Sequence, residues 1–144
     1  MNQELVKKFQ DRFEWVPKLN PLYNNEMVVP MYIDCDEGWF DLIWKLCEDI
    51  DVIVKREGWI DFSVDQIKEK FGGLRFYVNG ANKEVFDLIN DAEVKSFKMC
   101  ERCGKKGVSY VSFGWLKVLC AKCAKSDTKR TWVKITKTEI DGNK

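Results

Sequence analysis

Hydrophobic residues recur at helical spacing in three stretches of the chain. In residues 2–15, Leu5, Phe9 and Phe13 fall on one side of a short amphipathic helix. Residues 37–57 form a longer pattern, which acidic residues precede and Gly58 ends, as suits the helix dipole and a glycine stop. Its apolar face holds Trp39, Ile43, Leu46, Ile50 and Ile53. Residues 82–98 predict a third helix, whose apolar face holds Val85, Leu88, Ile89 and Ala92.

An alternating pattern predicts strands elsewhere. In residues 62–78, apolar residues alternate on both sides of Gly72 and Gly73, which indicates a β-hairpin. The same segment also fits a short helix that starts with a Ser63–Gln66 capping box and is followed by a strand at 74–78. We favour the hairpin. Residues 107–112, 115–119 and 131–140 predict three further strands, and the proline-containing segment 16–30 predicts a loop.

Four cysteines form the most specific motif of the chain. Sixteen residues separate the pair Cys100 and Cys103 from the pair Cys120 and Cys123, a spacing typical of a four-cysteine zinc site. Gly104 suits the tight turn after the first pair. The chain has no histidine, so mixed Cys/His ligation is excluded, and four thiolates leave no open coordination position. We therefore predict structural Zn²⁺; the alternatives are a thioredoxin-like dithiol and an iron–sulfur cluster.

These elements together predict an α+β fold. We expect a helical N-terminal body with a β-hairpin, followed by a four-cysteine zinc ribbon or treble-clef-like module. The boundary falls near residue 94, and the two parts can also pack as one domain.

Charge is divided unevenly along the 144 residues, although the net charge is only +1. Residues 1–94 hold 11 Lys and Arg against 19 Asp and Glu, a net charge of −8. Residues 95–144 hold 13 against 4, a net charge of +9. Such an asymmetry indicates either two different partners or two halves that attract each other, and both readings stay open.

Catalysis finds little support in the sequence. Without histidine, the commonest general base and the Ser/His and Cys/His nucleophile pairs are absent. The acidic cluster Asp34, Asp36, Glu37 and Asp41 matches no calcium loop and is explained by the start of a helix. Lys70 and Arg75 beside the two glycines could hold an anion, but a solvated hairpin face is the simpler account. We interpret Cys47 as a core residue and Cys35 as a structural loop residue.

Basic and aromatic residues surround the cysteines and are the candidate partner-binding residues. A basic groove with an aromatic platform is how sequence-tolerant nucleic-acid binders hold a strand. Trp115 would be that platform; alternatively, it covers the small core of the zinc module. The candidate residues are Arg102, Lys105, Lys106, Trp115, Lys117, Lys122, Lys129 and Arg130.

The segments DEGWFDLIWKLCEDI, IKEKFGGLRFYV, AEVKSFKMCERCG and GWLKVLCAKC, within residues 34–124, resemble a family of small, mostly uncharacterised proteins encoded by bacteriophages and prophages. In that family a GWFDLI helix, a KFG-LRFY segment and two CxxC pairs recur in the same order. The resemblance implies a phage or prophage origin and a bacterial cytoplasmic setting. It supports the four cysteines as metal ligands and implies no catalytic residue.

Three functions are therefore considered. The first is a zinc-stabilised binding protein whose basic module contacts DNA or RNA. The second is an inhibitor that binds a host protein or defence complex, by analogy with other small phage proteins. The third, a metal-dependent enzyme, is the least favoured. We expect no membrane span and no secretion signal, because charges interrupt the apolar stretches and the N-terminus lacks an apolar core.

Overall fold

The structure, a computed structural model, describes residues 1–23 and 27–136 and confirms the α+β class. In chain order the elements are α1 (Gln3–Arg12), β1 (Ile33–Asp34), the 3-10 turn η1 (Glu37–Trp39), α2 (Phe40–Glu57), β2 (Ser63–Lys70), β3 (Gly73–Asn79), α3 (Lys83–Ser96), β4 (Val108–Ser112), β5 (Trp115–Leu119), α4 (Ala121–Ser126) and β6 (Val133–Lys134). They form two three-stranded sheets, ordered β1-β2-β3 and β5-β4-β6.

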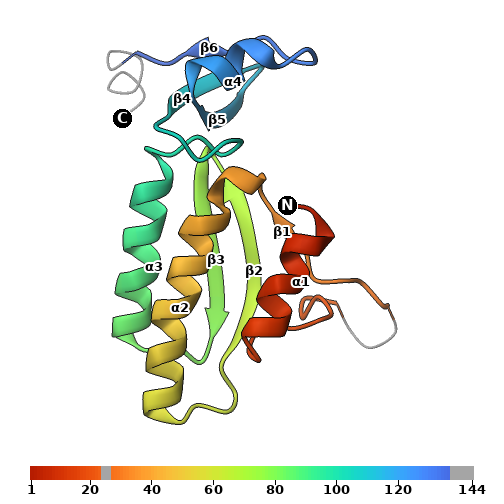
Figure 1. The fold of residues 1–144 in the computed structure, drawn as a ribbon, viewed down its shortest axis with the longest axis vertical. Coiled ribbons are helices and arrows are strands. Elements are labelled where there is room, and N and C mark those ends of the chain that lie inside the picture. The colour runs from red at the N-terminus through yellow and green to blue at the C-terminus, as the bar shows by residue number, and fades with distance from the viewer. Residues whose placement is uncertain (24–26, 137–144) are drawn as a thin grey trace.

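The body consists of the first sheet and the helices packed against it. In Figure 1, α2 lies in front of the sheet, with α3 and α1 on either side of it. The predicted apolar face of α2 is confirmed: Trp39, Ile43, Leu46, Ile50 and Ile53 are all buried. Gly58 ends α2 with a φ of 67°, in the left-handed region that glycine favours. On α1, Phe9 packs against the Phe40 and Trp44 rings, with centroid distances of 5.1 and 5.2 Å.

The preferred hairpin is confirmed, and the short-helix alternative is wrong. β2 and β3 pair antiparallel, with Ile67 opposite Phe76 and Lys68 opposite Arg75. The register shifts between Val64 and Gln66, so a bulge at Asp65 brings both Val64 and Ile67 to the core side. The buried and exposed side chains of β2 therefore do not alternate strictly, because the bulge places one extra residue between the buried Val64 and Ile67.

Two-residue turns close both hairpins of the molecule. The first is Phe71–Gly72, with φ of 53° and 84°; the second is Phe113–Gly114, with φ of 49° and 81°. Positive φ at both positions is the geometry of a type I′ turn, which matches the twist of the flanking strands. A bulky residue in the left-handed region is strained, and both phenylalanines are exposed, at 69% and 93%.

The C-terminal part differs from the sequence expectation in two places. The strand predicted over 131–140 is shorter: only Val133 and Lys134 pair, with Val111 and Tyr110 of β4, and residues 137–140 lie outside the described part. Helix α4 was not predicted, because its six residues are too few to show a helical period. A small core of Cys100, Tyr110, Leu119 and Ala124 holds these elements together.

The two halves meet along a tight seam. Gly38, in the η1 turn before α2, lies against the backbone carbonyls of Cys100 and Glu101, where a Cβ atom would collide with them. The indole N–H of Trp39 donates to the carbonyl of Met99, at 3.0 Å. Figure 1 shows the C-terminal elements above the ends of α3 and the hairpin. The acidic and basic halves are therefore in direct contact.

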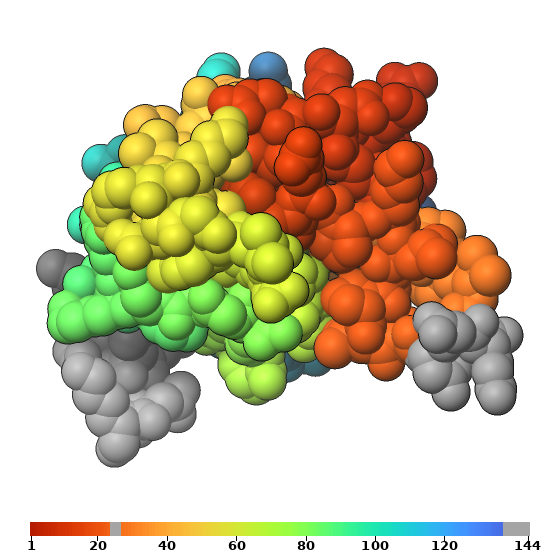
Figure 2. Space-filling model, turned by 90° about the horizontal axis from the view of Figure 1, so that it is seen from below, coloured from red at the N-terminus to blue at the C-terminus, as the bar shows by residue number. Residues whose placement is uncertain are grey.

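The opposite end of the body is formed by segments that are distant in sequence. Figure 2 shows this end, where the N-terminal segment lies beside the C-terminal end of α2. Within residues 1–23 and 27–136, no helix has both the length and the apolar character needed to cross a bilayer.

Candidate metal centre and partner-binding groove

Four cysteine side chains converge where two turns of the chain meet. Cys100 and Cys103 belong to the turn before β4, in which the N–H of Gly104 donates to the Cys100 carbonyl at 2.8 Å. Cys120 is the N-cap of α4, and Cys123 lies in the first turn of that helix. The hairpin β4–β5 brings the second pair back to the first. The sequence therefore predicted correctly that the two pairs come together.

The sulfur positions suit a tetrahedral metal ion. All four Sγ atoms lie within 4.8 Å of one another, and those of Cys103 and Cys120 are 3.7 Å apart. A tetrahedron with metal–sulfur bonds of about 2.3 Å has edges of about 3.8 Å. A disulfide would need about 2.05 Å between sulfurs, and all six cysteines are free. The cluster can therefore hold a metal ion.

The pKa values of the Cys120 and Cys123 thiols are shifted in the cluster, where the four sulfurs lie close together. The backbone N–H of Cys123 donates to the Cys120 sulfur and lowers the pKa of that thiol to about 7. Burial and the neighbouring sulfurs raise the pKa of Cys123 to about 12. Four thiolates so close together repel one another, and a divalent cation would offset that repulsion.

Two of the predicted partner-binding residues are engaged at the seam between the halves. Lys117 forms ion pairs with Asp36 at 2.9 Å and with the buried Glu101 at 3.4 Å. Arg102 pairs with Asp127 at 2.6 Å and lies 3.8 Å from Asp36. Asp36 comes from the acidic cluster at the start of α2, so part of that cluster binds the basic half. Burial raises the pKa of Glu101 to about 7, although Lys117 acts to lower it.

The other six predicted residues are exposed. Lys105 and Lys106 lie in the turn after the first cysteine pair, and Lys122 lies on α4. Lys129 and Arg130 follow α4, and Trp115 begins β5 with 61% of its surface exposed. In the described part of the chain, none of the lysines in this set forms an ion pair.

A groove gathers five of the eight predicted residues. It has a volume of about 260 Å³ and is lined by Glu69, Arg102, Trp115, Leu116, Lys117, Asp127, Lys129, Arg130 and Trp132. The Arg130 guanidinium lies over two indoles, 5.5 Å from the Trp115 ring and 6.0 Å from the Trp132 ring. Lys105, Lys106 and Lys122 do not line it. Among the described residues, Arg130 forms no ion pair with an acidic side chain.

Asp127 organises this groove, and sequence reasoning missed it. Its carboxylate accepts from Arg102 at 2.6 Å and from the Trp132 indole at 2.7 Å. It also accepts from the backbone N–H groups of Lys129 and Arg130, at 2.9 and 3.1 Å. Donation by the Trp132 indole and by Arg102 holds the pKa of Asp127 well below its usual range. The sequence gives little indication of this role, because an Asp that accepts from the backbone N–H two residues later is common in loops.

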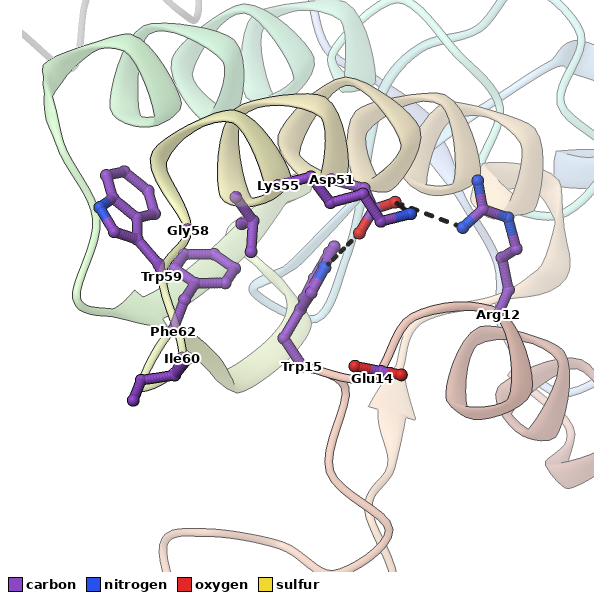
Figure 3. A pocket seen from close by; sticks show the side chains of 10 residues that line it. Arg12, Glu14, Trp15, Asp51, Lys55, Gly58, Trp59, Ile60 and Phe62 are labelled. Carbon is purple, nitrogen blue, oxygen red and sulfur yellow. Dashed lines mark hydrogen bonds and ion pairs between the residues drawn. The ribbon is translucent and has the colours of Figure 1, made fainter.

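A second cavity, at the far end of the body, is built around a buried carboxylate. It measures about 470 Å³, and Figure 3 shows Asp51 in it, held by Trp15 and Arg12. The Asp51 carboxylate accepts hydrogen bonds from the Trp15 indole at 3.0 Å and from Arg12 at 3.3 Å. It also forms an ion pair with Lys55 at 2.7 Å. Burial acts to raise the pKa of Asp51, but these three partners outweigh it and hold the pKa below its ordinary value. Asp51 thus joins α2 to the segment after α1.

We expect Asp51→Asn to lower the free energy of unfolding by about 1–3 kcal/mol at pH 7, because it removes charge-assisted hydrogen bonds from a buried site. A carboxylate with a lowered pKa stabilises the fold above its unfolded pKa of about 3.9 and loses that effect as pH falls. The difference between wild type and variant should therefore shrink at acid pH, as measured by urea unfolding. Asp49→Asn, which removes a surface pair with Lys45, is the control and should cost less than about 0.5 kcal/mol. An Asp51→Asn difference that does not change with pH would contradict this account.

The described residues contain no second cluster of three or more metal-ligating side chains. No family model, curated protein or solved structure matches the chain, so its function is argued from the geometry of the metal centre and the groove.

Proposed function

We propose that the protein is a zinc-stabilised module that binds single-stranded nucleic acid in the groove beside Trp115. Zn²⁺ is the metal that best suits four thiolates in a site without an open position. The arrangement of a turn, a hairpin and a helix that carries the second cysteine pair supports the treble-clef-like alternative over the zinc ribbon. In this proposal the metal holds the groove in shape and has no catalytic role.

The observation that carries the proposal is the position of the Arg130 guanidinium over the rings of Trp115 and Trp132. An indole that is 61% exposed offers a flat surface to a base, and stacking on aromatic rings is tolerant of sequence. Arg130 and Lys129 stand beside it, free to contact phosphate oxygens. Asp127 fixes the loop that presents both cations.

We expect Trp115→Ala to weaken binding of a short oligothymidine about 5- to 150-fold, the loss typical of one base–aromatic stack. Arg130→Gln should also make the salt dependence shallower, by about 0.7 in the slope of log K against log salt, if it contacts one phosphate. Both are measured by fluorescence anisotropy of a labelled oligonucleotide at several salt concentrations. Trp59→Ala, which removes a tryptophan from the far end of the body, is the control and should bind as wild type does. Absence of binding by the wild-type protein at low salt would overturn the proposal.

A second candidate is a protein partner, the inhibitor considered above. The observation that favours it is the exposure of Phe71 and Phe113, the first of which lines a mainly apolar hollow of about 330 Å³. Affinity capture from a bacterial lysate treated with nuclease distinguishes the two. A stoichiometric protein complex that is lost in Phe113→Ala, together with no oligonucleotide binding, would favour the protein partner.

A further inference from the structure

The solvent side of the body's sheet carries side chains that the groove does not use. In the register of β2 and β3, Lys68 stands opposite Arg75 and Gln66 opposite Tyr77. These pairs alternate with Ile67 opposite Phe76, which are buried. Lys68, Arg75 and Tyr77 therefore share the side of the sheet that faces away from the core.

This side is positively charged although the body as a whole is acidic. Lys68, Lys70 and Arg75 form no ion pair with any residue in the ranges 1–23 and 27–136. Among the described residues, the Arg75 side chain donates to the neighbouring Leu74 carbonyl alone, at 3.0 Å. Asp34 of β1 is in register with Lys68 but makes no ion pair with it. Three unpaired cations on one small surface match an anionic partner.

Aromatic rings lie beside two of these cations. Tyr77 and Phe97 are 42% and 41% exposed, and Lys68 lies 6.0 Å from the Tyr77 ring. The Phe97 ring rests directly on Gly73, where any Cβ atom would collide with it. Lys70 lies 5.5 Å from the ring of Phe71 at the turn. A positively charged surface that also exposes aromatic rings is the combination that holds single strands in sequence-tolerant binders.

The sheet surface and the groove meet at the tip of the first hairpin. A Cβ atom at Gly72 would lie 3.5 Å from the Cβ of Leu116, so the tip touches β5. The hollow of about 330 Å³ lies at this junction and is lined by Glu69, Lys70, Phe71, Gly114, Trp115 and Leu116. Glu69, Trp115 and Leu116 also line the groove, so the hollow and the groove are continuous at these three residues.

We propose that one nucleic-acid strand occupies both surfaces: it leaves the groove at Trp115, crosses the tip at Phe71 and continues over Lys68, Lys70 and Arg75. This inference rests on the proposed function and adds the N-terminal body to the binding site. It predicts that affinity depends on strand length, because a short strand fills only the groove and a longer one also reaches the sheet.

The test uses labelled oligothymidines of about 4, 8, 12 and 16 nucleotides, the range of site sizes found for small single-strand binders. The variant is Lys68→Gln, Lys70→Gln, Arg75→Gln in the full chain. We expect its affinity for the shortest strand to be unchanged and for the longest to fall about tenfold or more, with a salt slope shallower by about 2 for three lost phosphate contacts. The control, Lys7→Gln, Lys8→Gln, Lys83→Gln, removes the same charge from α1 and α3 and should leave the slope as in wild type.

The outcomes separate this inference from the proposed function. A triple variant that binds the longest strand with wild-type affinity and slope overturns the inference and leaves the groove as the whole site. Failure of the wild-type protein to bind any of the strands overturns both. If the triple variant does not fold, as seen by circular dichroism, the single change Lys70→Glu at the exposed tip answers the same question, since it should weaken only the longer strands.

Discussion

Replacing Cys123 by Ser is expected to abolish metal binding and unfold the C-terminal module. The wild-type protein should carry one zinc ion per chain, held by Cys100, Cys103, Cys120 and Cys123. Structural zinc contributes about 10–16 kcal/mol of apparent folding free energy in zinc-finger peptides at neutral pH. The small core of the module has no comparable source of stability, so removal of the ion by a chelator should have the same effect. Elemental analysis and amide hydrogen exchange of β4 and β5 measure both consequences.

Cys47→Ala is the matched control for this experiment. Cys47 is buried in the core of the body and lies outside the cluster, so the variant should keep one equivalent of zinc. Visible absorption from an iron–sulfur cluster, or a disulfide between Cys100 and Cys103, would contradict the zinc assignment. In the chelated protein we expect α1 to α3 to stay folded, because their core is separate from the module.

Trp39→Ala is expected to produce the largest loss of stability in the body, about 3–5 kcal/mol. Trp39 is fully buried, and its truncation leaves a cavity at the point where α2 supports the first cysteine pair. It also removes the N–H that donates to the Met99 carbonyl. If no water replaces that donor, the unsatisfied carbonyl lowers the free energy of unfolding by about 1–3 kcal/mol. Urea unfolding followed by far-ultraviolet circular dichroism gives the change in free energy.

Trp39→Phe separates the two contributions. It keeps most of the buried ring and loses only the indole N–H, so it should cost clearly less than the alanine change. Because Met99 precedes Cys100, we also expect Trp39→Ala to weaken zinc retention against a competing chelator, whereas Trp59→Ala should not. Equal zinc retention in wild type and Trp39→Ala would show that the seam does not support the metal centre.

Elements with a long, regular pattern could be predicted from the sequence, and short ones could not. Helix α2 is 18 residues long with consistent apolar spacing, so most of its buried face was predicted, although Asp51 and Val54 were missed. Strand β1 has two residues, and its parallel pairing with β2 is a long-range contact without a local signature. The bulge at Asp65 likewise leaves no mark in composition, because it is defined by the partner strand.

The metal centre could be predicted because it depends on the spacing of cysteines along the sequence. The ion pairs around the groove could not, because they depend on which side chains meet in the fold. Two CxxC motifs give the cluster, because each motif places its own two sulfurs together. The sequence analysis placed Arg102 and Lys117 among the candidate partner-binding residues, but the structure shows them in ion pairs with Asp127 and Asp36, respectively. Tertiary contacts decide which basic side chain pairs with which acidic one. The sequence therefore does not show that Arg130 lies over the rings of Trp115 and Trp132.

The two turns with phenylalanine at positive φ have a consequence for how the sequence can change. A left-handed backbone at a residue with a Cβ costs roughly 1–2 kcal/mol, and Asn or Gly would remove most of that cost at Phe71 and Phe113. A laboratory selection for thermal resistance alone should therefore replace both phenylalanines early. A selection that also demanded partner binding should retain them, if the rings contact the partner. The residues recovered at these two positions would thus record whether stability or recognition had been the stronger constraint.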